Sequence, residues 1–177
     1  RGDIIEIPPN SRHYAKGSTA YTTKIEQLAD QARTPLYKLT DGTKVGQHQG
    51  AHFFTIGQRK GLDVGGTKEP LFVIETDVAN NVIYTGQGKG HPGLYKTTLF
   101  VQKAEIHWLR EDLRLTDGES MRVMARIRYR QPLTLATLYQ VGTGLYVDFD
   151  QAQEAIAQGQ FVAWYIGNEL LGSGVIS

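Results

Sequence analysis

Four arginines recur at mostly alternate positions in residues 121–131, MRVMARIRYRQ. Alternate side chains of an extended strand point to the same face, so these arginines would share one face and the intervening apolar side chains the other. Guanidinium groups spaced by about 7 Å along a strand could bind successive phosphates of an RNA backbone. The alternative is a solvated face on which the arginines pair with carboxylates. The arginines are Arg122, Arg126, Arg128 and Arg130, and the apolar face would hold Val123, Ala125, Ile127 and Tyr129.

A second cationic cluster, Gln58-Arg59-Lys60, lies between Gly57 and Gly61. Thr55 could cap a short helix that contains these residues. Such a segment can bring its backbone and two cations close to a phosphate. An ordinary exposed helix end is the simpler interpretation of the same residues.

Metal binding and catalysis find little support. His48 and His52 are four residues apart, but Gly50 argues against a helix between them. The chain has no cysteine, which excludes a thiolate ligand, a disulfide or thiolate catalysis within these residues. No Ser-His-Asp or paired-carboxylate pattern is apparent. We therefore expect neither a metal site nor a catalytic residue in this chain.

The composition is that of a globular protein whose basic charge is local. The 177 residues carry a net charge of +1. Residues 1–96 hold 12 basic and 9 acidic side chains and residues 97–177 hold 7 and 9, so an RNA-binding surface must be a patch. No apolar run approaches the roughly 18 residues that span a bilayer, and no export signal is visible. We expect a cytoplasmic protein without a membrane partner, and, since the sequence does not begin with Met, a piece of a longer one.

The elements that must position these side chains are predicted to be mainly β, in two parts. Residues 1–96 are expected to form a small α+β domain. Residues 97–177 are expected to form a six-stranded antiparallel β-barrel, because closely spaced strand patterns alternate with turn signals. The first part would contain a strand at 2–7, a helix at 23–33 and a hairpin of 70–78 with 82–85. The six strands would be 98–108, 119–130, 133–141, 145–149, 161–166 and 169–176.

Several stretches, in order, resemble the tRNA-specific 2-thiouridylases. They are KVGQHQGAHFFTIGQRKGLDVGG (44–66), EPLFVIETDVANNVIYTGQG (69–88), HPGLY (91–95), RIRYRQPL (126–133) and GQFVAWYIGNELLGSGVI (159–176). The resemblance covers residues 41–177, and TIGQRKGL is its most specific motif. Residues 8–40 form an insertion to which the sequence assigns no role.

The resemblance implies a three-part parent enzyme. Its N-terminal domain would use ATP and Mg²⁺ to adenylate the wobble uridine, position 34, of glutamate, lysine and glutamine tRNAs. Two cysteines there would relay a persulfide sulfur, supplied by a relay protein or a cysteine desulfurase, to give 2-thiouridine. A central domain and a barrel similar to the second domain of translation factors would also bind the tRNA. This chain would be those last two parts, inactive alone.

The family's barrel contacts to tRNA carry over to Arg128, Tyr129 and Gln160. Strand parity supports an outward Arg128 but points Tyr129 inward, and a bulge would resolve the conflict. Two other functions remain open. One is a free-standing RNA-binding barrel without catalytic activity, and the other is an interaction module that never touches RNA.

Overall fold

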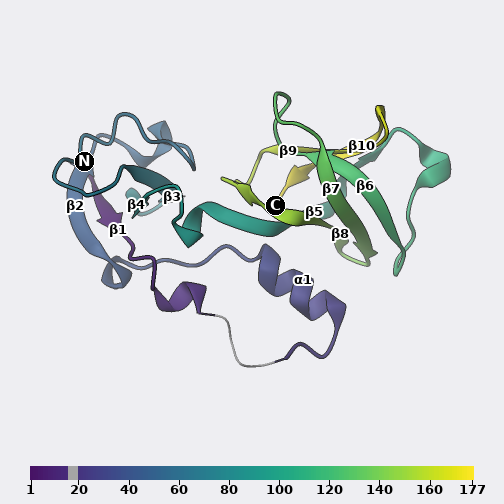
Figure 1. Cartoon of the computed structure of the whole chain (residues 1–177), viewed down its shortest axis with the longest axis horizontal. Helices are drawn as coiled ribbons and strands as arrows, with labels where there is room; N and C mark the ends of the chain where they lie inside the picture. The colour runs from purple at the N-terminus through teal and green to yellow at the C-terminus, as the bar shows by residue number, and fades with distance from the viewer. Residues whose placement is uncertain (16–19) are drawn as a thin grey trace. The chain divides into compact units, whose positions relative to one another are not determined.

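The computed structural model describes residues 1–15 and 20–177, which form two compact units (Figure 1). The first unit comprises Arg1–Ala20 and Thr34–Tyr95, and the second comprises Tyr21–Arg33 and Lys96–Ser177. The predicted insertion at 8–40 is therefore divided between the units, and its residues 16–19 lie outside the described residues.

A four-stranded mixed sheet of order β2-β1-β4-β3 forms the centre of the first unit. β1 (Gly2–Glu6) runs parallel to β4 (Val82–Gln87) and antiparallel to β2 (Thr43–His48), and β3 (Leu71–Asp77) pairs antiparallel with β4. The predicted hairpin is confirmed. Neighbouring residues of β1, β3 and β4 are buried in two different clusters, Ile4, Val73 and Ile83 in one and Ile5, Ile74 and Tyr84 in the other, so both faces of these three strands are covered. The described residues of this unit also form four short 3₁₀ helices, at Arg12–Tyr14, Leu39–Asp41, Ala51–Phe53 and Pro92–Leu94.

A closed antiparallel barrel of order β10-β5-β8-β7-β6-β9 forms the second unit. The predicted fold class, mainly β with a six-stranded barrel, is confirmed. Alternate residues of each strand point into the barrel, and the core includes both tryptophans. The strands are β5 (Tyr95–Trp108), β6 (Ser120–Arg126), β7 (Thr134–Val141), β8 (Gly144–Glu154), β9 (Phe161–Ile166) and β10 (Glu169–Ile176), with a 3₁₀ helix at Glu111–Leu113.

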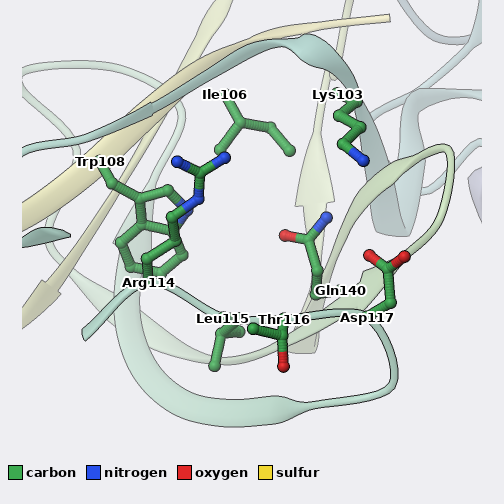
Figure 2. Close-up of a pocket in the computed structure, with 8 residues that line it drawn as sticks. All are labelled: Lys103, Ile106, Trp108, Arg114, Leu115, Thr116, Asp117 and Gln140. Carbon is green, nitrogen blue, oxygen red and sulfur yellow. The ribbon is translucent and has the colours of Figure 1, made fainter. Parts of the chain in front are cut away.

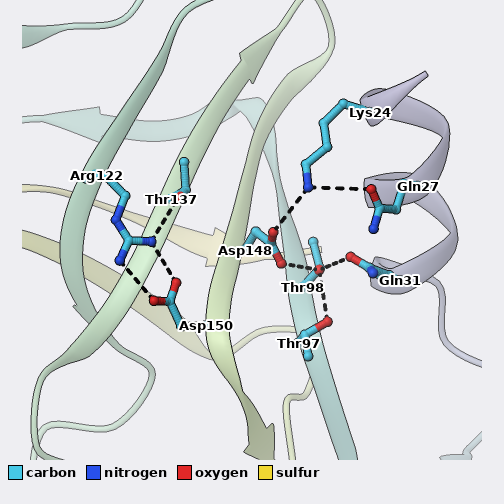
Figure 3. Close-up of polar contacts among 9 residues, drawn as sticks. All are labelled: Lys24, Gln27, Gln31, Thr97, Thr98, Arg122, Thr137, Asp148 and Asp150. Carbon is cyan, nitrogen blue, oxygen red and sulfur yellow. Dashed lines mark hydrogen bonds and ion pairs between the residues drawn. The ribbon is translucent and has the colours of Figure 1, made fainter.

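Helix α1 (Lys24–Ala32) is the helix predicted within the insertion, and it packs on the outside of the barrel. The Thr23 side chain accepts from the Glu26 N–H at 3.1 Å and so caps its first turn. Figure 3 shows the polar contacts that join α1 to β5 and β8. Lys24 Nζ lies 3.8 Å from the Asp148 carboxylate, and the Thr98 hydroxyl donates to the Gln31 side chain at 3.1 Å. Part of the insertion thus contributes to the surface of the barrel.

Candidate nucleic-acid interface

The arginine-bearing strand is shorter than predicted. β6 ends at Arg126, and residues 127–131 form a tight turn in which the Gln131 N–H donates to the Arg128 carbonyl at 3.0 Å. The Gln131 side chain accepts from the Ile127 N–H, also at 3.0 Å. Side-chain alternation therefore stops at Arg126. The prediction of a strand that runs to Arg130 with one arginine face is wrong beyond this point.

The position of Tyr129 shows what this change means. Parity pointed its side chain inward, but Tyr129 is 86% exposed at the turn. Pro132, which has no N–H to donate to a sheet ladder, follows the turn and favours the break in the strand. The conflict between strand parity and a tRNA-binding Tyr129 disappears because the residue is not in a strand.

Arg126 lies against two aromatic rings. Its guanidinium carbon is 5.1 Å from the ring centre of Tyr129 and 5.1 Å from that of Tyr165. Nη2 also donates to the Tyr165 hydroxyl at 3.0 Å. A cation over an aromatic face is attracted by the ring quadrupole. Arg126 therefore restrains the ring of the exposed Tyr129 while keeping its own charge at the surface.

Arg128 connects the turn to the last residue of β8 and to the residue after it. Its Nη1 donates to the Glu154 carbonyl at 3.0 Å and its Nη2 to the Ala155 carbonyl at 2.8 Å. Beside it, Gln131 Nε2 donates to the buried Gln153 at 2.7 Å. A guanidinium has five N–H donors, so Arg128 keeps unused donors on an exposed residue. It can hold the turn and still contact a phosphate.

Gln160 lies at the same end of the barrel. The antiparallel pairing of Arg126 with Ala163 places the start of β9 beside the end of β6. The Gln160 side-chain oxygen accepts from the Ala157 N–H at 3.2 Å, which orients the amide. The next residue, Phe161, is 66% exposed. The Gln160 amide and the exposed ring of Phe161 therefore lie at the same end of the barrel as the turn.

Arg122 does not belong to this surface. It forms a two-point ion pair with Asp150, with Nη1–Oδ1 at 2.6 Å and Nη2–Oδ2 at 2.9 Å, and donates to the Thr137 hydroxyl at 3.0 Å (Figure 3). Asp150 therefore balances the charge of Arg122. For this arginine the alternative prediction, a strand face on which the arginines pair with carboxylates, is confirmed. In the described parts of the chain, no carboxylate pairs with the other three arginines of the predicted row.

The Gln58-Arg59-Lys60 cluster belongs to the first unit and is not helical. The predicted helix capped by Thr55 is wrong. The Gln58 N–H donates to the Thr55 carbonyl at 3.1 Å in a turn. The Gly57 N–H donates to the Val73 carbonyl, and the Val73 N–H donates to the Gln58 carbonyl. Gly57 has a φ of 89°, a conformation that glycine adopts readily. Arg59 and Lys60 are exposed. A phosphate contact by these two residues remains a prediction, but a helix N-terminus would not contribute to it.

The histidines considered for metal binding have other contacts. His48 is buried, and its Nδ1 accepts from the Gly50 N–H at 3.0 Å while Nε2 lies 3.1 Å from the Asn81 carbonyl. The ring of His52 lies against that of Phe53. Within residues 1–15 and 20–177, no group of three or more side chains is placed to hold a metal ion. In the same residues, no helix is long and apolar enough to cross a membrane.

We call the surface at the end of β6 the turn platform. It combines exposed aromatic rings, which can stack on unpaired bases, with guanidinium groups, which can bind phosphates. Sequence reasoning missed Phe161 and Tyr165. The alternation in β9 could have indicated that both point outward, but not that β9 pairs with β6. The turn platform consists of Arg126, Arg128, Tyr129, Arg130, Gln160, Phe161 and Tyr165.

Two domain models match the chain one after the other. Residues 21–87 match the tRNA methyl transferase PRC-barrel domain, and residues 97–176 match the aminomethyltransferase beta-barrel domain. The second match covers all of the barrel strands except the first residues of β5.

Curated relatives match over almost the whole chain. The tRNA-specific 2-thiouridylase of Christiangramia forsetii is 58% identical over 99% of this chain and 45% of its own length, and that of Flavobacterium johnsoniae is 56% identical over the same shares. The enzyme of Karelsulcia muelleri is 47% identical over 100% of this chain and 43% of its own length. The chain thus spans less than half the length of these relatives. Both domains and these identities show that the chain belongs to the family of tRNA-specific 2-thiouridylases.

Proposed function

We propose that this chain is the C-terminal, tRNA-binding part of a tRNA-uridine 2-sulfurtransferase, and that the turn platform contacts the tRNA. The observation that carries the proposal is the exposed ring of Tyr129, restrained by Arg126 next to the exposed Arg128 and Arg130. A ring that is 86% exposed buries little apolar surface and so adds little to the stability of the fold, whereas a restrained ring beside cations suits a base with its phosphate.

The whole protein would act on the wobble uridine, position 34, of glutamate, lysine and glutamine tRNAs in the cytoplasm. It would use ATP and Mg²⁺, and a sulfur-relay protein or cysteine desulfurase would supply the persulfide. None of the 177 residues is a cysteine, so a persulfide relay needs residues outside this sequence. We propose that this chain binds and orients tRNA and leaves the sulfur transfer to the rest of the parent protein.

A free-standing RNA-binding module is the second candidate, and the comparisons do not favour it. The relatives that match the chain are named as thiouridylases and are more than twice its length. An interaction module without RNA would not need exposed arginines around a restrained tyrosine.

Binding of the 177-residue chain to unmodified transcripts of the three tRNAs, measured across a salt series, tests the proposal. We expect the affinity to fall as salt rises, since arginine–phosphate contacts release counterions. Absent binding, or binding that ignores salt, would overturn it.

A further inference from the structure

A hollow of about 470 Å³ opens at the end of the barrel opposite the turn platform (Figure 2). Three elements of the second unit line it. β5 supplies Lys103, Ile106 and Trp108, the β5–β6 connection supplies Arg114, Leu115, Thr116 and Asp117, and β7 supplies Gln140. The pairings Ser120 with Tyr139 and Ala125 with Thr134 place Gln140 and the 127–131 turn at opposite ends of the β6–β7 hairpin. The seven residues of β6 separate them by about 20 Å.

The floor of the hollow presents one oriented hydrogen-bond acceptor. Gln140 is only 6% exposed, and its Nε2 donates to the carbonyls of Val141 at 3.2 Å and Gly144 at 3.0 Å. Both N–H groups of the amide nitrogen are therefore in use. Figure 2 shows the amide oxygen turned toward the side of Arg114. A ligand on this floor must bring an N–H or O–H donor.

One wall is a rigid aromatic ring. Trp108 is 8% exposed and packs edge-on against the fully buried Trp164, with ring centres 5.4 Å apart. Ile106 and Leu115 add apolar surface beside it. The wall therefore suits a flat, weakly polar ring.

The rim carries more positive than negative charge. Lys103 and Arg114 are cationic, and Asp117 is the one carboxylate among the lining residues. Arg114 Nη1 lies 3.6 Å from Glu111 Oε2. Both side chains are more than half exposed, so water screens this ion pair and its contribution is small. An anionic group attached to the ring can lie between the two cations.

We propose that this hollow binds a nucleotide whose base is not stacked in a helix. The ring lies along Trp108, and an amino or imino N–H on its edge donates to Gln140 Oε1. The phosphate lies at the rim near Lys103 and Arg114. A free phosphate would use only the rim, and an apolar ligand would leave the buried acceptor without a partner, which costs free energy. The nucleotide can come from an RNA strand or from the free pool, and only the first source draws on the proposed tRNA function.

Nuclear magnetic resonance of the ¹⁵N-labelled 177-residue chain tests the proposal, because the chain has two tryptophans and hence two indole N–H signals. Trp108→Phe assigns them, and buried Trp164 is the internal reference. The probes are UMP, CMP, AMP, GMP, a single-stranded tetranucleotide and inorganic phosphate. We expect the Trp108 indole and Gln140 amide signals to shift with nucleotides much more than the Trp164 signal. Shifts with mononucleotides indicate the free pool as a source, and shifts with the tetranucleotide alone indicate an RNA strand.

Two results would overturn the proposal: equal shifts with inorganic phosphate, or no shift of the Trp108 signal with any nucleotide. The variants Lys103→Ala and Arg114→Ala should each lower the salt dependence of tetranucleotide binding by about one unit of slope. Arg122→Ala is the matched control, because Asp150 already balances its charge. Tyr129→Ala separates this site from the turn platform, since it should reduce tRNA binding and leave the nucleotide shifts at Trp108 unchanged.

Discussion

Arg128 donates from Nη2 to the backbone carbonyl of Ala155 at 2.8 Å. Ala155 has a φ of 57°, a left-handed conformation that is unusual for a residue with a Cβ. The neighbouring carbonyl of Glu154 accepts from the same guanidinium. The residue that the family resemblance assigns to tRNA therefore also connects the 127–131 turn to the end of β8.

Replacement of Arg128 should consequently change two properties together. Arg128→Ala removes two charge-assisted bonds to backbone carbonyls, and we expect a loss of about 1 kcal/mol in the free energy of unfolding, together with weaker tRNA binding. Arg128→Lys cannot reproduce the two-point geometry and should recover only part of both. Denaturant unfolding and tRNA titration of the three proteins measure this. An unchanged free energy of unfolding in Arg128→Ala would show that the carbonyl contacts are dispensable.

Replacement of Tyr129 should affect binding alone. Its ring is 86% exposed, so Tyr129→Ala should leave the melting temperature unchanged. Loss of one stacked base is worth about 1–3 kcal/mol, which corresponds to roughly 5- to 150-fold weaker tRNA binding. Tyr129→Phe keeps the ring and should bind nearly as well as the wild type. The control is Ile166→Ala, a partly exposed side chain at the opposite end of β9. Equal binding by wild type and Tyr129→Ala would remove Tyr129 from the interface.

The ion pair of Arg122 and Asp150 gives a prediction about acid stability. A hydrogen bond from Arg122 holds the pKa of Asp150 below its usual value of 3.8. A carboxyl whose pKa is lowered in the folded state stabilises the protein above its unfolded pKa and loses that contribution as pH falls through the folded value. Arg122→Ala should thus be less stable than wild type at pH 6, and the difference should shrink below pH of about 4. Unfolding curves at several pH values measure it, and a difference that stays constant with pH would contradict the pairing. The affinity for tRNA should not change.

The barrel could be predicted from the sequence because its signals are local. Alternation such as Val123 and Ala125 in β6, with turn residues between strands, is visible within a few residues. The end of β6 could not be predicted in the same way. Four further residues of matching alternation lie in a turn that Gln131 and Gln153 stabilise, and Gln153 is distant in sequence.

Other features depend on contacts that no short pattern contains. Gln58 is in a turn rather than a helix because its neighbour Gly57 and its own backbone pair with Val73. Tyr165 reaches Arg126 only because β9 closes the barrel against β6. The periodicity predicted α1 itself, since its pattern is local, but not the surface on which it packs.

The docking of α1 should be separable from the folding of the barrel. Leu28 is its one buried residue, and Lys24 and Gln31 make polar contacts with the barrel. Truncation of a buried leucine usually costs about 2–5 kcal/mol. If α1 docks separately from barrel folding, the loss cannot exceed the free energy of docking. Leu28→Ala should speed hydrogen exchange in α1 about tenfold or more and leave β7 unchanged. Ile25→Ala, an exposed position on the same helix, is the control. Faster exchange throughout the barrel would mean that α1 is integral to it.

His91 should make the first unit sensitive to mild acid. The ring is 1% exposed, its Nε2 lies 2.8 Å from the Ile7 carbonyl, and its Nδ1 accepts from the Gly93 N–H at 3.0 Å. This pattern fits a neutral ring that donates from Nε2, because a protonated Nδ1 could not accept. Burial lowers the pKa of His91, while Ile7 and Glu6 act in the opposite direction and do not cancel the effect.

The sign of the effect follows from linkage. In the unfolded chain the His91 ring binds a proton near pH 6.5, whereas in the folded chain it does so only at lower pH. The free energy of unfolding therefore has its full value above a pH of about 6.5 and decreases as the pH falls toward the folded pKa. The slope for one such group is at most about 1.4 kcal/mol per pH unit. Burial lowers the pKa of His48 in the same way, so two groups contribute. His91→Asn, which keeps an acceptor for Gly93 but does not titrate, should be less stable at pH 7.5 yet lose less stability between pH 7.5 and 5.5. The matched control is His52→Asn, the same exchange at an exposed position. If wild type and His91→Asn lose equal stability over this range, the buried ring does not titrate as the geometry requires.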